Sequence, residues 1–215
     1  MMTLQLVKKD FLIAKKYVLF MMGFTAVIPL FVVVSVPAMT GTGAFIYSVI
    51  FTVIIILQSA AMEEAKHPKA IALLCAAPYS RKSFVMAKYA CFFILFAYCY
   101  AVYCLLGVIF ISVEFISLSS LLAVLMCGTI IYSVFLPIYF KLGFEKTKFI
   151  FQIAIIVFAF GPPLFLRLYT NLNFSINVLA YLPAVTINIA MILVSFVTLL
   201  VSMNLSMKIF SRKEL

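Results

Sequence analysis

Residues 44–62, "AFIYSVIFTVIIILQSAAM", decide the fold class, because they form a long apolar run without a charged residue. A bilayer core about 30 Å thick is crossed by a helix of about 20 apolar residues. The rest of the chain has the same character: its 215 residues are 67% hydrophobic and 10% charged, with a mean hydropathy of +1.27. A soluble domain carries about 25% charged residues. We therefore predict an all-α integral membrane protein.

Apolar runs of this length recur along the chain and predict six transmembrane helices in one domain that covers residues 1–215. The first run is longer than the 7–15 apolar residues of a cleaved signal peptide, so we expect it to be a membrane span. The predicted spans are residues 17–38, 44–62, 84–113, 116–140, 149–166 and 184–207.

The basic residues indicate how these spans are oriented. All but one of the 16 Lys and Arg residues precede the first span, lie between spans two and three or four and five, or follow span six. Only Arg167 falls on the other side. By the positive-inside rule, both termini are cytoplasmic in a multi-pass protein of the cell membrane. The net charge of +10 therefore reflects membrane orientation and does not indicate a nucleic-acid partner. The basic residues are expected to contact lipid headgroups.

The N-terminal segment, "MMTLQLVKKDFLIAKKY" (residues 1–17), has helical spacing. One face is apolar (Leu4, Val7, Phe11 and Ala14) and another is polar (Gln5, Lys8, Lys9 and Lys16). Such a segment is expected to lie as an amphipathic helix in the cytoplasmic membrane interface. The alternative is a basic flank that only sets the orientation of span one. The residues predicted to form this interfacial helix site are Lys8, Lys9, Asp10 and Phe11.

Residues 160–183, "FGPPLFLRLYTNLNFSINVLAYLP", follow the fifth predicted span on the outer side. Gly161, Pro162 and Pro163 are expected to interrupt the helix, while the following leucines remain too apolar for an exposed loop. A re-entrant or interfacial element accounts for both features if protein shields its backbone. An ordinary outer loop is the alternative. We treat Gly161, Pro162, Pro163 and Arg167 as candidates for an outer gate.

Residue types needed for catalysis are missing. The sequence contains neither the GxxxxGK[ST] pattern that binds ATP phosphates nor an HExxH pattern, and its only histidine is His67 in a predicted loop. The five cysteines show no CxxC pair and read as small buried apolar residues. Glu114 lies at an outer junction, as a turn residue or a proton-coupling group. We expect no enzymatic activity of the chain itself, no metal site and no directly bound cofactor.

Residues 63–83, "EEAKHPKAIALLCAAPYSRKS", form the predicted cytoplasmic loop after span two. Glu63 and Glu64 close the span, and a short helix is expected to run to Pro78, which stops it. Ser80 is then placed to cap the helix that continues into span three. The apolar residues of the short helix (Ile71, Leu73 and Leu74) and Tyr79 either dip into the lipid interface or insert into a partner protein.

Three motifs in this order resemble those of permease subunits of ATP-binding-cassette exporters of the second exporter type. They are a "KKD" segment before span one, an acidic residue after span two, and a turn leading to "VxxKY". The resemblance is to the compact six-span bacterial branch, similar to exporters of phenol-soluble modulins or other peptides. Ala77 stands where the family usually has Leu. The matching positions are Lys8, Lys9, Asp10, Glu63, Glu64, Pro78, Ser80, Arg81, Lys82, Val85, Lys88 and Tyr89.

This resemblance implies that the loop is a coupling helix docked into a separate cytoplasmic ATPase subunit, which supplies ATP and Mg²⁺. It also implies a second permease chain, identical or related, and export of amphipathic peptides, peptide antibiotics or lipid-like molecules from a bacterial cell. A self-contained ion-coupled carrier or channel, and a non-transporting anchor or sensor subunit, remain alternatives. The predicted coupling residues are Glu63, Glu64, His67, Leu74, Pro78, Tyr79, Ser80, Arg81 and Lys82.

Overall fold

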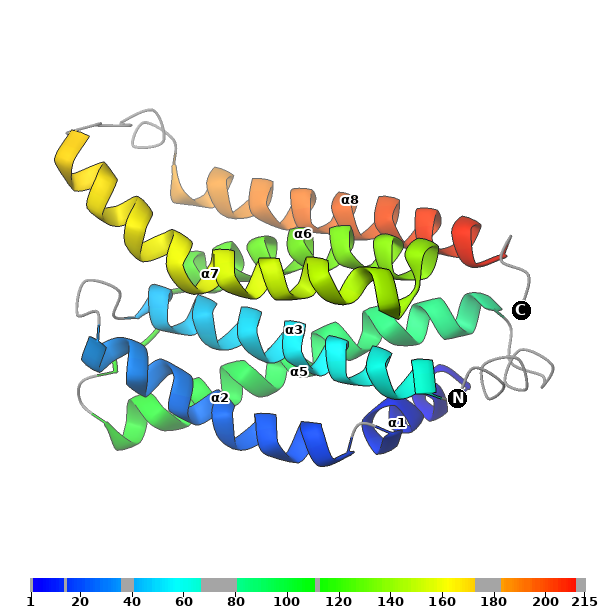
Figure 1. The fold of residues 1–215 in the computed structure, drawn as a ribbon. Helices are drawn as coiled ribbons and strands as arrows, with labels where there is room; N and C mark the ends of the chain where they lie inside the picture. Colours follow the sequence, from blue (N-terminus) through cyan, green and yellow to red (C-terminus); the bar gives the residue numbers. More distant parts are fainter. Residues whose placement is uncertain are drawn as a thin grey trace.

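The computed structural model describes residues 2–13, 15–35, 41–66, 81–110, 113–172 and 183–211, and these residues form seven α-helices without a β-strand (Figure 1). The predicted all-α fold is confirmed in this part of the chain. The helices are α1 (Met2–Ile13), α2 (Lys15–Ser35), α3 (Thr42–Lys66), α5 (Arg81–Ile109), α6 (Leu118–Leu142), α7 (Phe144–Leu172) and α8 (Ala184–Ser211).

Five of these helices contain segments long and apolar enough to cross a membrane. They correspond to the first, second, third, fourth and sixth predicted spans, with ends that differ by a few residues. Helix α7 covers the fifth predicted span, but it is not among these five, so the count of six stays a prediction. The five segments are Lys15–Val34, Thr42–Lys66, Lys82–Ile109, Leu118–Leu142 and Val185–Ser211.

Helix α3 lies at the centre of the bundle. It contacts α1, α2, α5, α6 and α7, whereas α8 packs mainly on α6. Phe45 and Val49 of α3 are fully buried, and most of the exposed surface of α2 and α8 is apolar. The start of α1 and the end of α8 lie at the same end of the bundle (Figure 1). We call this the terminal end.

Hydroxyl groups fasten α2 to α3 within the apolar core. The Thr25 hydroxyl donates to the Met21 carbonyl at 2.7 Å and lies 3.1 Å from the hydroxyl of Thr52. Ser48 donates to the Thr25 carbonyl at 3.1 Å. Because these polar atoms are paired with one another, they can be buried between two apolar helices without a large desolvation cost.

Local sequence explains where α6 begins and ends. The Ser117 hydroxyl accepts a hydrogen bond from the Ser120 backbone N–H at 3.2 Å, as an N-cap does. At the other end Gly143 has a φ of 76°, a conformation that a residue without a Cβ adopts most easily, and its N–H bonds the Tyr139 carbonyl at 2.9 Å. Helix α7 then begins at Phe144 without a longer loop.

The expected interruption at Gly161–Pro163 is wrong, because α7 continues to Leu172. Proline removes one helix hydrogen bond and crowds the preceding turn, yet a long helix can continue past it with a change of direction. Figure 1 shows the later half of α7 turning away from the other helices. Arg167 also falls within this helix. Residues 173–182 lie outside the described residues, so a re-entrant element before α8 stays a prediction.

The predicted coupling helix also lies outside the described residues, in the segment 67–80. Its two flanking helices are described: α3 ends at Lys66 and α5 begins at Arg81. The start of α5 directly after Ser80 agrees with the expected helix boundary, although Ser80 itself is outside the described part. The short helix therefore remains a prediction.

The packing of α6 on α5 depends on a glycine, which gives the first test. A Cβ at Gly128 would lie 3.2 Å from Cζ of the fully buried Phe92, whereas a Cβ at Gly23 of α2 would meet nothing within 4 Å. We expect Gly128→Val to lower the free energy of unfolding by about 1–3 kcal/mol through overpacking. Gly23→Val, with the same gain in helix propensity, is expected to leave it unchanged. Thermal unfolding in mild detergent, followed by circular dichroism, compares the two. Equal midpoints would contradict this packing.

Candidate functional site

Glu64, one turn or less from the end of α3, is buried, although its neighbour Glu63 is not. Glu64 is 5% exposed, while the Glu63 carboxylate pairs with Lys66 at 2.7 Å near the surface. Successive residues of a helix point in directions about 100° apart, so two adjacent acids cannot share one environment. A carboxylate removed from water in this way needs compensating charges and hydrogen bonds.

Lys88 of α5 supplies the main compensating charge. Its side chain is 3% exposed, and the ammonium nitrogen lies 2.7 Å from Oε1 of Glu64 and 3.1 Å from Oδ2 of Asp10. Glu64 lies two residues before the end of α3, and Lys88 lies in the second turn after the start of α5. The pair therefore joins the two helices that flank the segment 67–80.

Helix α1 contributes one further positive and one further negative group. The Lys9 ammonium lies 3.0 Å from Asp10 Oδ1 and 3.4 Å from Glu64 Oε1. Asp10 Oδ1 accepts no hydrogen bond among the described residues, so its contact with Lys9 is a charge interaction without hydrogen-bond alignment. The four groups balance, two positive and two negative. We call Lys9, Asp10, Glu64 and Lys88 the ionic cluster.

Aromatic side chains complete the surroundings of the ionic cluster. The Tyr139 hydroxyl of α6 donates to Glu64 Oε2 at 2.9 Å, and the Tyr132 hydroxyl donates to the Lys88 carbonyl at 2.5 Å. The Phe84 ring lies 4.9 Å from the Lys9 nitrogen and 5.5 Å from the Lys88 nitrogen, within cation–π range. Both oxygens of Glu64 are thereby satisfied, and both ammonium groups rest on an aromatic face.

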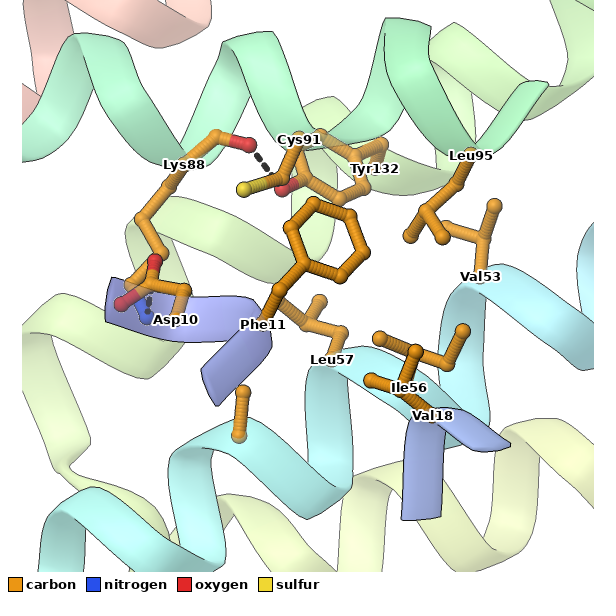
Figure 2. Close-up of a pocket in the computed structure, with 11 residues that line it drawn as sticks. Asp10, Phe11, Val18, Val53, Ile56, Leu57, Lys88, Cys91, Leu95 and Tyr132 are labelled. Carbon is orange, nitrogen blue, oxygen red and sulfur yellow. Dashed lines mark hydrogen bonds and ion pairs between the residues drawn. The ribbon is translucent and has the colours of Figure 1, made fainter. Parts of the chain in front are cut away.

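A small cavity of about 30 Å³ adjoins the cluster. Asp10, Lys88 and Tyr132 lie on its wall, and Figure 2 shows the Phe11 ring lying among these groups, with Leu57 beside it. One water needs about 10–15 Å³ of such volume and at least two polar partners. The cavity is therefore large enough for an internal water beside Asp10 Oδ1, the acceptor that lacks a hydrogen bond.

A family model described as "ABC-2 family transporter protein" matches residues 5–211 of the chain. This protein belongs to the ABC-2 transporter family. No curated protein and no solved structure gave a match to the chain. Members of the ABC-2 family are membrane components of transporters, in agreement with the five apolar helices, and the chain is accordingly a multi-pass membrane protein.

The fold of this ABC-2 protein brings together three residues that the sequence indicated for two separate sites. Lys9 and Asp10 were assigned to an interfacial helix and Glu64 to a coupling loop, but all three belong to the ionic cluster. Lys88 was part of the resemblance motif without an assigned role. Tyr139 and Tyr132 were missed, and nothing in their sequence pattern separates them from the other tyrosines. The membership of Glu64 in a coupling site stays a prediction.

The remaining predicted residues that the structure describes are not members of the ionic cluster. Lys8 and Lys82 are exposed, and Phe11 is half-buried against the cavity. Arg81 begins α5, and Gly161, Pro162, Pro163 and Arg167 lie within α7. No group of His, Cys, Asp or Glu side chains among the described residues is arranged to hold a metal ion. The residues outside the described part are His67, Leu74, Pro78, Tyr79 and Ser80.

The prediction of a polar face on the N-terminal helix is partly wrong. Helical spacing puts Lys9 on the polar face with Gln5 and Lys8, but Lys9 points toward Glu64 and its side chain is 20% exposed. The buried side of α1 contains Leu6, Val7 and Asp10, and it packs on α5 and α3. The inward side of α1 therefore carries two charged residues, Lys9 and Asp10, which pair with Glu64 and Lys88. A location of α1 in the membrane interface stays a prediction.

The ionic cluster predicts a dependence of stability on charge balance. Lys88→Met leaves two carboxylates facing only Lys9, and we expect it to lower the free energy of unfolding by about 3–5 kcal/mol. When Glu64→Gln is added, Lys9 and Asp10 remain as one positive and one negative group. The double variant is therefore expected to be more stable than Lys88→Met alone. Thermal unfolding in mild detergent measures both. The matched control is Lys66→Met at the exposed pair with Glu63, where we expect little change.

A double variant that is less stable than Lys88→Met would contradict the role of charge balance. In that case Glu64 would stabilise the fold through its bond with Tyr139 rather than through Lys88.

Proposed function

We propose that this chain is the permease subunit of an ATP-driven exporter, working with a separate cytoplasmic ATPase subunit. The family match over residues 5–211 supports a transporter, and the sequence has no phosphate-binding loop of its own. The single observation that best supports coupling to a partner is the buried pair Glu64–Lys88, which joins the helices on both sides of the segment 67–80.

The ionic cluster gives this segment a mechanical connection to the bundle. A partner protein that pushes or pulls on residues 67–80 acts on the end of α3 and the start of α5 at once. Because Glu64 and Lys88 are paired at 2.7 Å in a buried site, the two helix ends move together. Lys9 and Asp10 add α1 to the same unit. Movement of the segment is therefore passed to three helices and not absorbed by one.

The side on which the partner acts follows from the positive charges. Lys66, Lys82, Lys141 and Lys208 lie at helix ends that gather at the terminal end of the bundle (Figure 1). Arg167 lies in the later half of α7, which extends toward the opposite end. The positive-inside rule then makes the terminal end cytoplasmic. This is the side on which ATP is available.

Association with an ATPase subunit is the first test. The chain, tagged at its C-terminus, is extracted from its native membrane in mild detergent, and co-purifying proteins are identified by mass spectrometry. We expect an ATP-binding-cassette ATPase in the wild-type sample and its loss with Arg81→Ala or Tyr79→Ala. Lys146→Ala is the matched control, because it removes an exposed charge from the first turn of α7, on the same predicted side but away from the segment 67–80. A chain that purifies alone in several detergents would instead favour a self-contained carrier.

We propose amphipathic peptides, peptide antibiotics or lipid-like molecules as the cargo, moved by two permease chains together with two ATPase subunits. The family resemblance supports the dimer. The apolar, aromatic-rich composition, with 23 Phe and 11 Tyr, supports an amphipathic cargo.

The cargo class is tested on the purified complex in vesicles. An amphipathic cationic peptide is expected to increase ATP hydrolysis several-fold, whereas a scrambled peptide of the same composition without an apolar face leaves it unchanged. The double variant Glu64→Gln, Lys88→Met, which keeps the charges of the cluster balanced, is expected to keep basal hydrolysis and lose the increase, because no ion pair joins α3 and α5. Equal stimulation by both peptides would argue against an amphipathic cargo without affecting the ATPase partnership.

A further inference from the structure

A partly enclosed groove lies between α3, α6 and α7, away from the ionic cluster. Its volume is about 260 Å³. Ile46 and Ile50 of α3 form one wall, Ile130 and Ile131 of α6 form another, and Phe158 of α7 forms the third. Ile46 and Ile50 lie one helical turn apart on α3. Cys127 of α6 lies one turn before Ile130 and Ile131. Each helix therefore presents a single strip of side chains to the groove.

The walls of this groove exclude polar ligands. Tyr47 of α3 also lines the groove, but its side chain is buried. The other lining residues are isoleucine, phenylalanine and cysteine, whose side chains offer no strong hydrogen-bond donor or acceptor. A peptide group or a lipid headgroup placed among them would lose its bonds to water without full replacement. The lining residues of α3 and α6 also lie inside the segments long and apolar enough to span a membrane. The medium that faces the groove is therefore hydrocarbon.

The size of the groove selects among apolar occupants. An enclosed apolar cavity of about 150 Å³ stays dry and holds a molecule as large as benzene. The groove is larger, and it is open on one side, so a flexible chain can enter from the bilayer while its headgroup remains outside. Phospholipid chains are also the most abundant molecules at that position, and mass action favours their binding.

We propose that this groove binds an acyl chain of a bilayer phospholipid, held between α3, α6 and α7. The chain supplies the apolar contacts that the three helices do not make with one another at this level. It acts as a structural ligand that sets the spacing between α3 and α7. This proposal does not depend on the ATPase partner or on the cargo.

The chain contains no tryptophan, so a single introduced tryptophan reports on its surroundings. Phe158→Trp places the reporter on the groove wall, and Phe196→Trp places a control on α8 at a side chain that is 60% exposed outside the groove. Both variants are reconstituted in phosphatidylcholine vesicles whose acyl chains are brominated, because bromine quenches tryptophan fluorescence on contact. The vesicles are then dissolved in excess dodecyl maltoside without bromine, and the remaining quenching is measured.

We expect both reporters to be quenched in the vesicles. After exchange into detergent, Phe196→Trp recovers its fluorescence, because lipid at an open surface is replaced, while Phe158→Trp stays mostly quenched. Adding Ile130→Phe to Phe158→Trp fills the groove and is expected to abolish the retained quenching. Val134→Phe, one turn further along α6 and outside the groove, is the matched control and is expected to preserve it.

Two results would overturn the proposal. Equal recovery of both reporters in detergent would show that the groove holds no chain more firmly than the open surface does. A Phe158→Trp reporter that is never quenched in brominated vesicles, beside a quenched Phe196→Trp, would show that protein covers the groove, as in contact with a second copy of the chain. The comparison of the two reporters stands even if Ile130→Phe fails to fold. Co-purification of an ATPase is unaffected by either result.

Discussion

The pairing of Glu64 with Lys88 is the interaction on which the arrangement of the bundle depends. Transfer of either ion from water into the interior costs several kcal/mol, and this cost is offset only when an opposite charge and good hydrogen bonds are present together. Lys88 has Glu64 and Asp10 within 3.1 Å, and both oxygens of Glu64 are satisfied. The rotation of α3 and α5 about their axes is therefore fixed, since a turn of either helix would leave a buried charge unpaired.

Aromatic residues extend this constraint to helices that contribute no charge. Tyrosine suits this role because its ring packs in an apolar core while its hydroxyl bonds a polar group. Tyr139 and Tyr132 bring α6 to the ionic cluster. Phe84, which contacts both ammonium groups, stacks on Phe210 with ring centroids 5.2 Å apart and so brings in the end of α8. Helices α6 and α8 thereby pack against the ionic cluster formed by α1, α3 and α5.

The sequence was sufficient for the fold class and for the approximate limits of five of the six predicted spans, because length and hydropathy are local properties. It was not sufficient for the ionic cluster. Lys9 and Glu64 are 55 positions apart, and helical spacing alone assigned Lys9 to a water-facing surface because a lysine is rarely buried without a partner. The family resemblance selected Lys9, Asp10, Glu64 and Lys88 as separate motifs. Only the tertiary fold shows that they meet.

The error at Gly161–Pro163 has a different cause. A glycine followed by two prolines ends most helices in water, where the chain can hydrogen-bond to solvent instead. In an apolar environment the backbone has no such alternative, and a helix that changes direction satisfies more of its hydrogen bonds than an interrupted one. Helix α7 continues through both prolines and reaches Leu172. Sequence rules derived from soluble helices therefore place the helix end too early here.

Helix α3 connects two regions of opposite character. Its end at Glu64 lies in the charged, closed cluster, and its earlier turns at Ile46 and Ile50 line the apolar, open groove. The separation from Ile50 to Glu64 corresponds to about 21 Å of helix. At the level of the groove, the hydroxyls of Ser48 and Thr52 hold α2 alongside α3. A hydrogen-bonded helix resists compression and twisting, so a displacement imposed at the cluster reaches the groove without being absorbed on the way.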